Sequence, residues 1–466
     1  MEGLLLFDQH DLYSKYINIL TEFCHSHVNF ILALLLFAII FYRTWRKTPI
    51  LLVDFECYQP PLNHRVPISS FIEHSLMREQ ELNTSGVAEF EKKMSIRSGI
   101  GNESYATLGM DLIPVDTSFK YSMEEVRSAL FSVTEILLRK LKISPNSIDI
   151  LITNCSVFCP TPSLAAMVIN KFGFRSNVRS FHLSGMGCSA GLLSISLAKD
   201  LLKVHKNSLA LVLSTETICS SLYKGSVKSM LLANCLFRVG SAAILLSNRN
   251  SDRDVAKYEL QHLVRTHLGA RDDAYSCVYQ KADDQGNVGV SLSRSVVEVA
   301  SEALKTNMST LGPLVLPYSE QIRYAINFLW NKFRPSTTSK KKATYVPNFK
   351  KAFDHFCIHA GGKAVIDGIK EMLKLGDADV EASKMTLHRF GNTSSSSTWY
   401  SLCYIEAKRR VKKGDKVFQI CFGSGFKCNS AVWKCVSKRS SATNVTNVWS
   451  ASIDRYPLDV PEVISY

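Results

Sequence analysis

The chain has 466 residues, of which 46% are hydrophobic and 21% are charged, so its composition is that of a globular protein and excludes a disordered one. The formal net charge of +14 suits nucleic acid, an anionic membrane surface or a phosphorylated small molecule as partner. We expect no nucleic-acid partner, because the sequence has neither zinc-finger spacing nor a basic helix with interleaved aromatic residues.

An uncharged apolar run lies near the N-terminus, at Val28–Tyr42, and is followed by Arg43, Arg46 and Lys47. As a helix this run rises about 22 Å, and the neutral residues before it bring the length near the roughly 30 Å of a bilayer core. The basic cluster predicts that everything after it lies in the cytosol. We therefore interpret residues 1–50 as a membrane anchor, with one span or a hairpin left open. A buried core helix is the alternative.

Residues 51–250 alternate β-rich runs with helical stretches, a rhythm typical of a sheet covered by helices. The expected elements are a helix over 123–141, a strand over 148–153, a helix over 163–172, a strand over 178–183, a helix over 192–202, and strands over 209–215 and 240–247.

Residues 251–437 repeat a similar order, which predicts a duplicated α/β unit. The expected elements are a strand over 255–266, a helix over 294–308, a strand over 354–359, a helix over 361–375, and strands over 416–422 and 431–436. The basic stretch 334–344 is interpreted as a solvated loop or, alternatively, as a patch facing lipid or phosphate. We expect residues 438–466, rich in Ser, Thr and Asn, to form a peripheral tail.

Cys188 lies in the most informative segment, Leu183-Ser-Gly-Met-Gly-Cys-Ser-Ala-Gly191. The pattern predicts a strand, a glycine turn and a helix, with the thiol in the first helical turn. A helix N-terminus favours negative charge and lowers a thiol pKa, which produces a nucleophile. Small neighbours also let a substrate carbonyl approach the sulfur. The residues alone leave open that Cys188 is a buried, inert cysteine.

A cysteine nucleophile usually works with a histidine and a polar orienting group from elsewhere in the chain. His359 ends an apolar strand just before a pair of glycines, and Asn392 lies in a loop of small residues. By themselves, His359 is better explained as a structural histidine and Asn392 as a turn residue. The thirteen cysteines occur singly and without a Cys-x-x-Cys pair, so we expect reduced thiols and no metal site.

From residue 53 to residue 433 the sequence resembles the plant 3-ketoacyl-CoA synthases, the condensing enzymes of the microsomal fatty acid elongase. The matching blocks occur in order along the body: 154–163, 185–191, 234–240, 264–270, 310–317, 359–362, 387–397 and 422–429. The resemblance implies a thiolase-like fold of two α/β halves in αβαβα layers. Residues 51–250 would carry the nucleophile, and residues 251–437 the histidine and asparagine.

The resemblance also implies the chemistry: Cys188 takes an acyl group from a long-chain acyl-CoA, and malonyl-CoA then loses carbon dioxide. His359 and Asn392 would stabilise the resulting enolate, which attacks the acyl-cysteine. The oxyanion hole would combine the N–H of Cys188 with the loop Gly423, Ser424, Gly425 and Phe426. No cofactor is required. The implied partners are the elongase reductases and dehydratase and a second copy of the chain, at the endoplasmic reticulum membrane.

Three further histidines lie in matching blocks. His355 is four residues before His359, which places both on one face of a strand, so we expect it to support the site. We expect His267 and His388 to hold loops by hydrogen bonds.

The sequence departs from the family pattern at His182, Thr217 and Lys224. These departures leave chain-length preference and full activity open. Two alternatives therefore remain: a catalytically impaired paralogue that serves as an interaction subunit of the elongase, and a polyketide synthase of the chalcone-synthase type. Chalcone-type synthases are soluble, so the predicted anchor argues against the second.

Overall fold

The computed structural model describes residues 14–15, 28, 30, 32, 36, 48–81, 84–112, 115–333, 345–437 and 446–459. The chain divides into two compact units, Met1–Pro49 and Ile50–Tyr466, and the second, here called the body, carries the fold. None of the described helices is long and apolar enough to cross a membrane. The run Val28–Tyr42 lies almost wholly outside the described residues, as does the basic stretch 334–344, so both interpretations stay predictions.

Nine strands of the body form one mixed sheet in the order β3-β2-β4-β5-β1-β6-β11-β10-β9. The first half supplies β1 (Leu51–Cys57), β2 (Ile150–Asn154), β3 (Arg179–Leu183), β4 (Leu209–Glu216) and β5 (Gly240–Ser247). The second half supplies β6 (Tyr258–His267), β9 (His355–Ile358), β10 (Lys416–Gly423) and β11 (Lys427–Cys435). A separate hairpin is formed by β7 (Val278–Ala282) and β8 (Val288–Leu292).

Strand pairing repeats between the two halves. In the first half β2 and β4 are parallel, β5 is antiparallel to β4, and β1 is antiparallel to β5. In the second half β9 and β10 are parallel, β11 is antiparallel to β10, and β6 is antiparallel to β11. The halves meet through short pairing of Leu51 with Glu259 and of Leu52 with Tyr258. This repeated order agrees with the predicted duplication.

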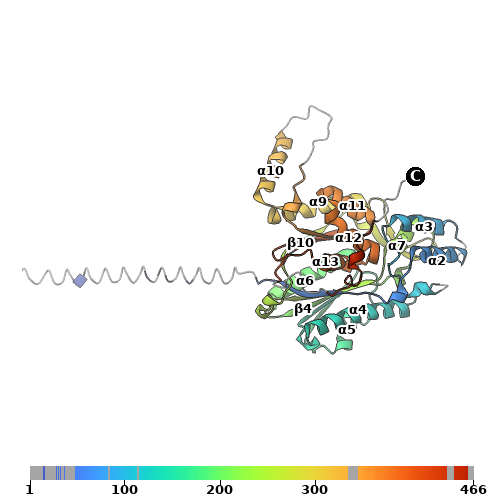
Figure 1. Ribbon diagram of the computed structural model, residues 1–466, viewed down its shortest axis with the longest axis horizontal. Coiled ribbons are helices and arrows are strands. Elements are labelled where there is room, and N and C mark those ends of the chain that lie inside the picture. Colours follow the sequence, from blue (N-terminus) through green and yellow to red (C-terminus); the bar gives the residue numbers. More distant parts are fainter. Residues whose placement is uncertain are drawn as a thin grey trace, which may run out of the picture. The chain divides into compact units, whose positions relative to one another are not determined.

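Helices lie on both faces of each half (Figure 1). One outer layer holds α4 (Phe119–Leu141) and α5 (Leu164–Phe172), and the other holds α9 (Val296–Val315) and α11 (Lys363–Leu373). Between the halves lie α6 (Ala190–Val204) and α13 (Ser397–Ala407). The remaining helices are α2 (Ile68–Glu81), α3 (Val87–Arg97), α7 (Lys228–Leu236), α8 (Asp272–Ser276), α10 (Tyr318–Phe333) and α12 (Asp377–Phe390).

Strand β4 shows why the sheet is covered on both faces. Leu211 and Leu213 pack into the core beneath α4 and α5, whereas Ala210 and Val212 join the central core with α6. Successive side chains of a strand point to opposite faces, so a strand that is apolar at every position must be buried on both. The layering is therefore α, β, α, β, α, as predicted.

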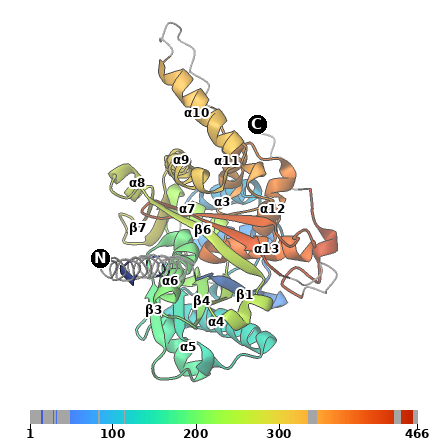
Figure 2. The ribbon, with the colours of Figure 1, turned by 90° about the vertical axis from the view of Figure 1, so that its left-hand side faces the viewer.

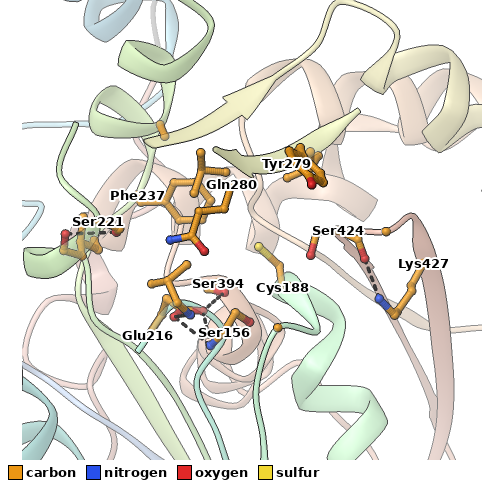
Figure 3. Close-up of a pocket in the computed structure, with 18 of the residues that line it drawn as sticks. Ser156, Cys188, Glu216, Ser221, Phe237, Tyr279, Gln280, Ser394, Ser424 and Lys427 are labelled. Atoms are coloured by element: carbon orange, nitrogen blue, oxygen red, sulfur yellow. Dashed lines mark hydrogen bonds between the residues drawn. The ribbon is translucent and has the colours of Figure 1, made fainter. Parts of the chain in front are cut away.

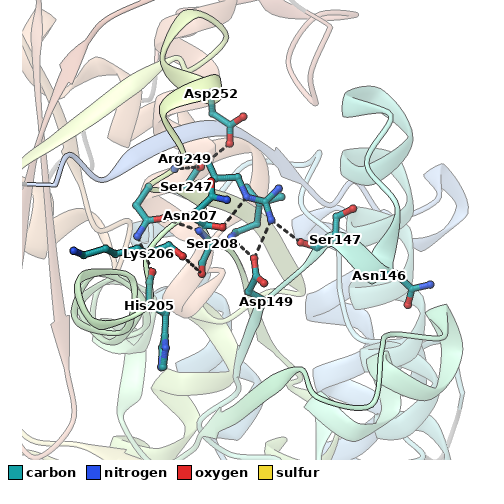
Figure 4. A network of polar contacts seen from close by, with 12 residues as sticks. Asn146, Ser147, Asp149, His205, Lys206, Asn207, Ser208, Ser247, Arg249 and Asp252 are labelled. Atoms are coloured by element: carbon teal, nitrogen blue, oxygen red, sulfur yellow. Dashed lines mark hydrogen bonds and ion pairs between the residues drawn. The ribbon is translucent and has the colours of Figure 1, made fainter.

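Charged side chains hold the end of the sheet where β2 and β4 begin (Figure 4). Asp149 Oδ2 accepts hydrogen bonds from Arg249 Nη2 at 3.0 Å and from the backbone N–H of Leu209 at 2.7 Å. Arg249 Nη2 also donates to the carbonyl of Ser147 at 3.2 Å. This network lies at the opposite end of these strands from their carboxyl ends, where Asn154 and Glu216 lie.

The predicted elements agree with the structure within three residues, except at three ends. Helix α4 begins at Phe119, four residues before the expected start at 123. Helix α9 continues to Val315, seven residues past the expected end at Met308. Strand β11 starts at Lys427, four residues earlier than expected. Its early residues look like a loop because Asn429 and Ser430 are polar. Ser430 is nevertheless buried, and its hydroxyl donates to Asn307 Oδ1 of α9 at 2.6 Å.

The prediction of a peripheral C-terminal tail is wrong for the described residues 446–459. Trp449 is fully buried in the central core, and its indole N–H donates to the carbonyl of Tyr400 at 2.9 Å. The guanidinium of Arg389 lies 4.9 Å from its ring. A polar composition describes the average residue of the segment, whereas burial of one large aromatic side chain decides where this segment lies.

Candidate active site

The nucleophile turn has the predicted form. Strand β3 ends at Leu183, a 3-10 turn spans Gly187–Ser189, and α6 begins at Ala190, so Cys188 lies at the start of the helix. Gly187 has a φ of +66°, and a Cβ placed there would lie 2.4 Å from the backbone nitrogen of Ser424. Only glycine allows both this conformation and this close approach.

The loop 423–426 packs directly against the nucleophile turn. A Cβ on Gly423 would lie 2.3 Å from Ser189 Oγ and 2.6 Å from the carbonyl oxygen of Met186. Lys427 Nζ donates to the carbonyl of Ser424 at 2.7 Å and holds the loop in place. The structure thus brings the predicted oxyanion loop next to Cys188.

Two cavities meet at Cys188. The first has a volume of about 540 Å³ and includes Cys188, Glu216, Phe237, Ser394 and Lys427 in its lining (Figure 3). The second, of about 340 Å³, has a largely apolar lining that includes residues of α9 and α11. Cys188, Phe237, Val278 and Ser424 border both cavities. A group bound to the sulfur is therefore accessible from two directions.

His359 and Asn392 line the second cavity together with Cys188. His359 follows β9, and its Nδ1 lies 2.6 Å from the hydroxyl oxygen of Ser397. Asn392 Oδ1 accepts from the backbone N–H of Ser394 at 2.9 Å, and its Nδ2 donates to the carbonyl of Gly361 at 3.3 Å. These contacts fix the orientation of both side chains. All three residues predicted for catalysis converge on one cavity.

The protonation states differ from the sequence expectation. Burial raises the pKa of the Cys188 thiol to about 12, and the nearby carboxylate of Glu216 adds to this rise, although the hydroxyl of Ser394 opposes it. Burial lowers the pKa of His359 to about 4. The expected lowering of the thiol pKa at the helix start is thus outweighed by desolvation. At neutral pH the resting pair is a thiol and a neutral imidazole.

Glu216 is a site residue that the sequence reasoning missed. It ends β4 and is almost fully buried, and its Oε1 accepts from Cys155 Sγ at 3.2 Å and from the backbone N–H of Ser156 at 3.0 Å. Its Oε2 accepts from Ser394 Oγ at 3.0 Å. Burial raises the pKa of Glu216. The signal in the sequence was a carboxylate at the end of a strand whose first five residues are apolar.

The three supporting histidines lie in different places. His267 lines the first cavity, and its Nδ1 accepts from the backbone N–H of Gly269 at 3.0 Å, as expected for a loop-holding residue. His388 lies on α12 with its ring against Gly101, and it lines neither cavity. His355 starts β9, about 13 Å along the strand from His359, and pairs with Asp415 at 2.9 Å. The structure does not bring it into the site.

The residues at which the sequence departs from the family pattern do not line these cavities. His182 Nδ1 shares a hydrogen bond with the hydroxyl of Thr153 at 2.8 Å. Thr217 Oγ1 donates to Glu125 Oε1 at 2.5 Å, and Lys224 Nζ donates to the carbonyl of Val115 at 3.3 Å. Thr217 is the nearest of the three to the site in sequence, because it follows Glu216.

Within the described ranges, no cluster of three or more His, Cys, Asp or Glu side chains is placed to hold a metal ion.

Comparison with known proteins places this site in a family. A model described as FAE1/Type III polyketide synthase-like protein matches residues 42–333, and one described as 3-oxoacyl-[acyl-carrier-protein] synthase III C terminal matches residues 350–435. Among curated relatives from Arabidopsis thaliana, 3-ketoacyl-CoA synthase 5 is 51% identical, covering 92% of this chain and 86% of its own length. 3-Ketoacyl-CoA synthase 7 is 53% identical, covering 88% of this chain and 87% of its own. This chain belongs to the 3-ketoacyl-CoA synthase family.

The fold of this family member is thiolase-like. A solved structure, 1,3,6,8-tetrahydroxynaphthalene synthase from Streptomyces coelicolor A3(2), is a bacterial type III polyketide synthase and superposes with a TM-score of 0.63. The match covers 83% of this chain and 99% of that one at 17% identity. At this identity the likeness shows the fold alone. It agrees with the α/β layers and the mixed sheet described above.

Proposed function

We propose that this protein is a 3-ketoacyl-CoA synthase that condenses malonyl-CoA with a long-chain or very-long-chain acyl-CoA. The products are a 3-ketoacyl-CoA two carbons longer, free CoA and carbon dioxide. The convergence of Cys188, His359 and Asn392 on the second cavity carries the proposal, together with the opening of the sulfur to the first cavity. The family to which the chain belongs supports it.

The first half-reaction loads the acyl group. His359 Nε2 takes the proton of the Cys188 thiol, and Sγ attacks the thioester carbon of acyl-CoA. The new C–Sγ bond forms as the bond to the CoA sulfur breaks, and the proton passes to the departing CoA thiolate. A neutral imidazole suits this role, because only an unprotonated nitrogen accepts the proton. Backbone N–H groups of Cys188 and the 423–426 loop would stabilise the oxyanion.

The second half-reaction extends the chain. The bond between the malonyl carbon and its carboxylate breaks, carbon dioxide leaves, and the electron pair forms an enolate. Donors at His359 Nε2 and Asn392 Nδ2 would stabilise the enolate oxygen. The enolate carbon attacks the acyl carbonyl, the C–Sγ bond breaks, and Cys188 takes up a proton from solvent. No metal or redox group takes part in these steps.

The two cavities suit different parts of the substrates. Arg97 and Lys363 lie in the lining of the second cavity, where they complement the phosphates of a CoA thioester. The first cavity does not include His359 or Asn392, which act on the malonyl thioester, and its Val157 and Ile218 offer an apolar wall to an acyl chain. We assign the second cavity to the CoA arm and the first to the acyl group.

The cellular setting that we propose rests on the sequence. The run Val28–Tyr42 and the basic residues after it would anchor the protein in the endoplasmic reticulum membrane with its body in the cytosol. The other elongase enzymes, the reductases and the dehydratase, would act on its product. A homodimer is part of the same proposal.

Yeast microsomes that contain this protein test the proposal, with labelled malonyl-CoA and acyl-CoA acceptors of different lengths. We expect 3-keto products two carbons longer than the acceptor, and none from Cys188→Ala, because the acyl carrier is lost. Cys159→Ala is the matched control: Cys159 is an exposed cysteine that lines neither cavity, so its product should equal that of the wild type.

Each other outcome has a distinct meaning. Equal product from the wild type and Cys188→Ala would contradict the catalytic role. No product from either protein, with normal insertion into microsomes, would support an interaction subunit without turnover. Products that contain several malonyl units would support a polyketide synthase.

A further inference from the structure

Helix α10, Tyr318–Phe333, exposes an unusual amount of apolar surface. Seven large side chains are each between 50% and 82% exposed, and six of them, Tyr318, Ile322, Ile326, Leu329, Trp330 and Phe333, lie on one side of the helix, whereas Phe328 lies on another. The helix projects from the body next to α9 (Figure 2). Scattered single exposed hydrophobic residues are normal on a protein surface, but a contiguous set of this size marks an interaction site.

These six residues form one stripe. At 3.6 residues per turn they fall within about 120° of the helix circumference and extend about 22 Å along it. Arg323 lies about 20° beyond one edge of the stripe, and Lys332 lies about 40° beyond the other. The side chain of Arg323 is 64% exposed. An apolar stripe with a basic residue at each edge is typical of a helix that lies in a membrane interface.

Polar residues outside the stripe, Glu320 and Asn327, bind the chain itself. Glu320 is fully buried, and its Oε2 accepts from the hydroxyl of Tyr345 at 2.5 Å and from the backbone N–H of Asn348 at 3.0 Å. Asn327 Oδ1 accepts from the backbone N–H of Tyr345 at 2.9 Å. The returning segment thus binds the polar side of the helix, which leaves the apolar stripe facing away from the body.

We propose that the α10 stripe docks on the surface of an anionic lipid bilayer. Trp330 and Tyr318 have the amphipathic rings that favour the headgroup level, and the aliphatic residues between them would enter the acyl boundary. A second copy fits less well, because pairing two stripes brings their basic edges together. This docking is independent of the proposed N-terminal anchor and of the proposed reaction.

Docking would also have a consequence for the site. Helix α9 runs directly into α10, and its residues Val296, Val297 and Ala300 line the cavity that holds His359 and Asn392. A bilayer contact at α10 would hold this face of the body near the membrane, where long-chain acyl thioesters partition.

A cleavage experiment with the full chain tests the docking separately from the anchor. A protease site is inserted after Lys47, and the protein is reconstituted in vesicles of phosphatidylcholine and phosphatidylserine. The vesicles are sedimented after cleavage, and the body that remains bound is measured. We expect the wild-type body to stay with the vesicles, and we expect high salt to release more of it from phosphatidylserine-rich vesicles than from phosphatidylserine-poor ones, because salt screens the attraction to the anionic lipid.

Two double variants locate the contact on the helix. Ile326→Ser with Trp330→Ser removes part of the stripe and should weaken vesicle binding of the cleaved body by about tenfold or more. Tyr324→Ser with Phe328→Ser is the matched control, because these exposed residues lie on another face, stacked on each other at 6.5 Å between ring centroids. It should bind like the wild type. Circular dichroism of the released proteins checks that each body is folded.

Two outcomes would overturn the proposal. One is release of the wild-type body to the same extent as Ile326→Ser with Trp330→Ser. The other is a released wild-type body that light scattering finds to be a dimer and that the same double variant converts to a monomer; the stripe would then bind a second copy.

Discussion

Among the described residues, the hydroxyl of Ser397 is the side chain bonded to the imidazole of His359, and both residues are buried. A neutral imidazole carries one N–H, so whichever atom bonds to Nδ1 decides what Nε2 can do. A hydroxyl either donates or accepts. Ser397 is therefore compatible with an Nε2 that accepts the Cys188 proton and with an Nε2–H that donates to the enolate oxygen.

This contact makes Ser397 a positioning residue. We expect Ser397→Ala to lower the kcat of condensation by about tenfold to a hundredfold, because His359 loses the partner that orients its ring. The KM for malonyl-CoA should change little, since the lost interaction acts in the transition state. Steady-state kinetics in microsomes measure both constants.

Ser401→Ala is the control for this change. Ser401 lies one turn later on α13, is equally buried and donates to Thr386 Oγ1 at 3.1 Å, away from His359. Its kcat should stay within about twofold of the wild type. Equal losses of kcat in the two variants would show that Ser397 acts only through the stability of α13.

At the scale of elements, the site depends on how the nucleophile turn meets the loop after β10. Gly185 and Gly187 have nearly the same φ, +67° and +66°. Their surroundings differ: nothing lies within 4 Å of a Cβ on Gly185, whereas one on Gly187 would meet the backbone of Ser424. Substitution by alanine at Gly185 therefore tests the effect of backbone strain, whereas substitution by alanine at Gly187 also tests the contact between the turn and the loop.

We expect Gly185→Ala to cost about 1–2 kcal/mol of unfolding free energy and to keep most of the activity, because the added methyl strains the backbone but meets no neighbouring atom and takes up little of the first cavity, which Gly185 lines. Gly187→Ala should cost more and abolish condensation, because it also pushes the oxyanion loop away from Cys188. Thermal unfolding in detergent and the microsomal assay measure the two effects. Comparable activity of the two variants would argue against a function for the contact between turn and loop.

At the scale of the whole molecule, the central core joins both halves and part of the C-terminal segment. Trp449 packs with Phe390 at 5.1 Å and with Tyr404 at 4.9 Å between ring centroids. Phe390 ends α12, and Tyr400 and Tyr404 lie on α13, the helix that begins at Ser397. Residues 446–456 thus support the helix that carries the partner of His359.

Trp449→Ala should destabilise the protein by about 3–5 kcal/mol, the usual cost of removing a buried aromatic side chain. Trp330→Ala is the matched control, since Trp330 on α10 is 65% exposed and its loss should cost about 0.5 kcal/mol or less. Chemical unfolding in detergent compares the two. Similar unfolding free energies for both variants would contradict the assignment of the tail to the core.

The sequence by itself determined the local pattern of the site and most of the sheet. Strands β4 and β5 each contain five consecutive apolar residues, and glycines on both sides of Cys188 require a tight turn, so periodicity and residue type predicted these elements. The roles of His359 and Asn392 came from the resemblance to a family, because nothing local distinguishes them from structural residues.

Tertiary structure decided what depends on neighbours distant in sequence. It placed His355 against Asp415 and away from the site. His355 lies at the start of the strand that His359 follows, but a common strand face does not imply a common site. It buried Trp449 within a polar segment and brought Glu216 to the cavity. It also set the protonation of Cys188 and His359, since desolvation depends on the atoms packed around a group rather than on the residues beside it in the chain.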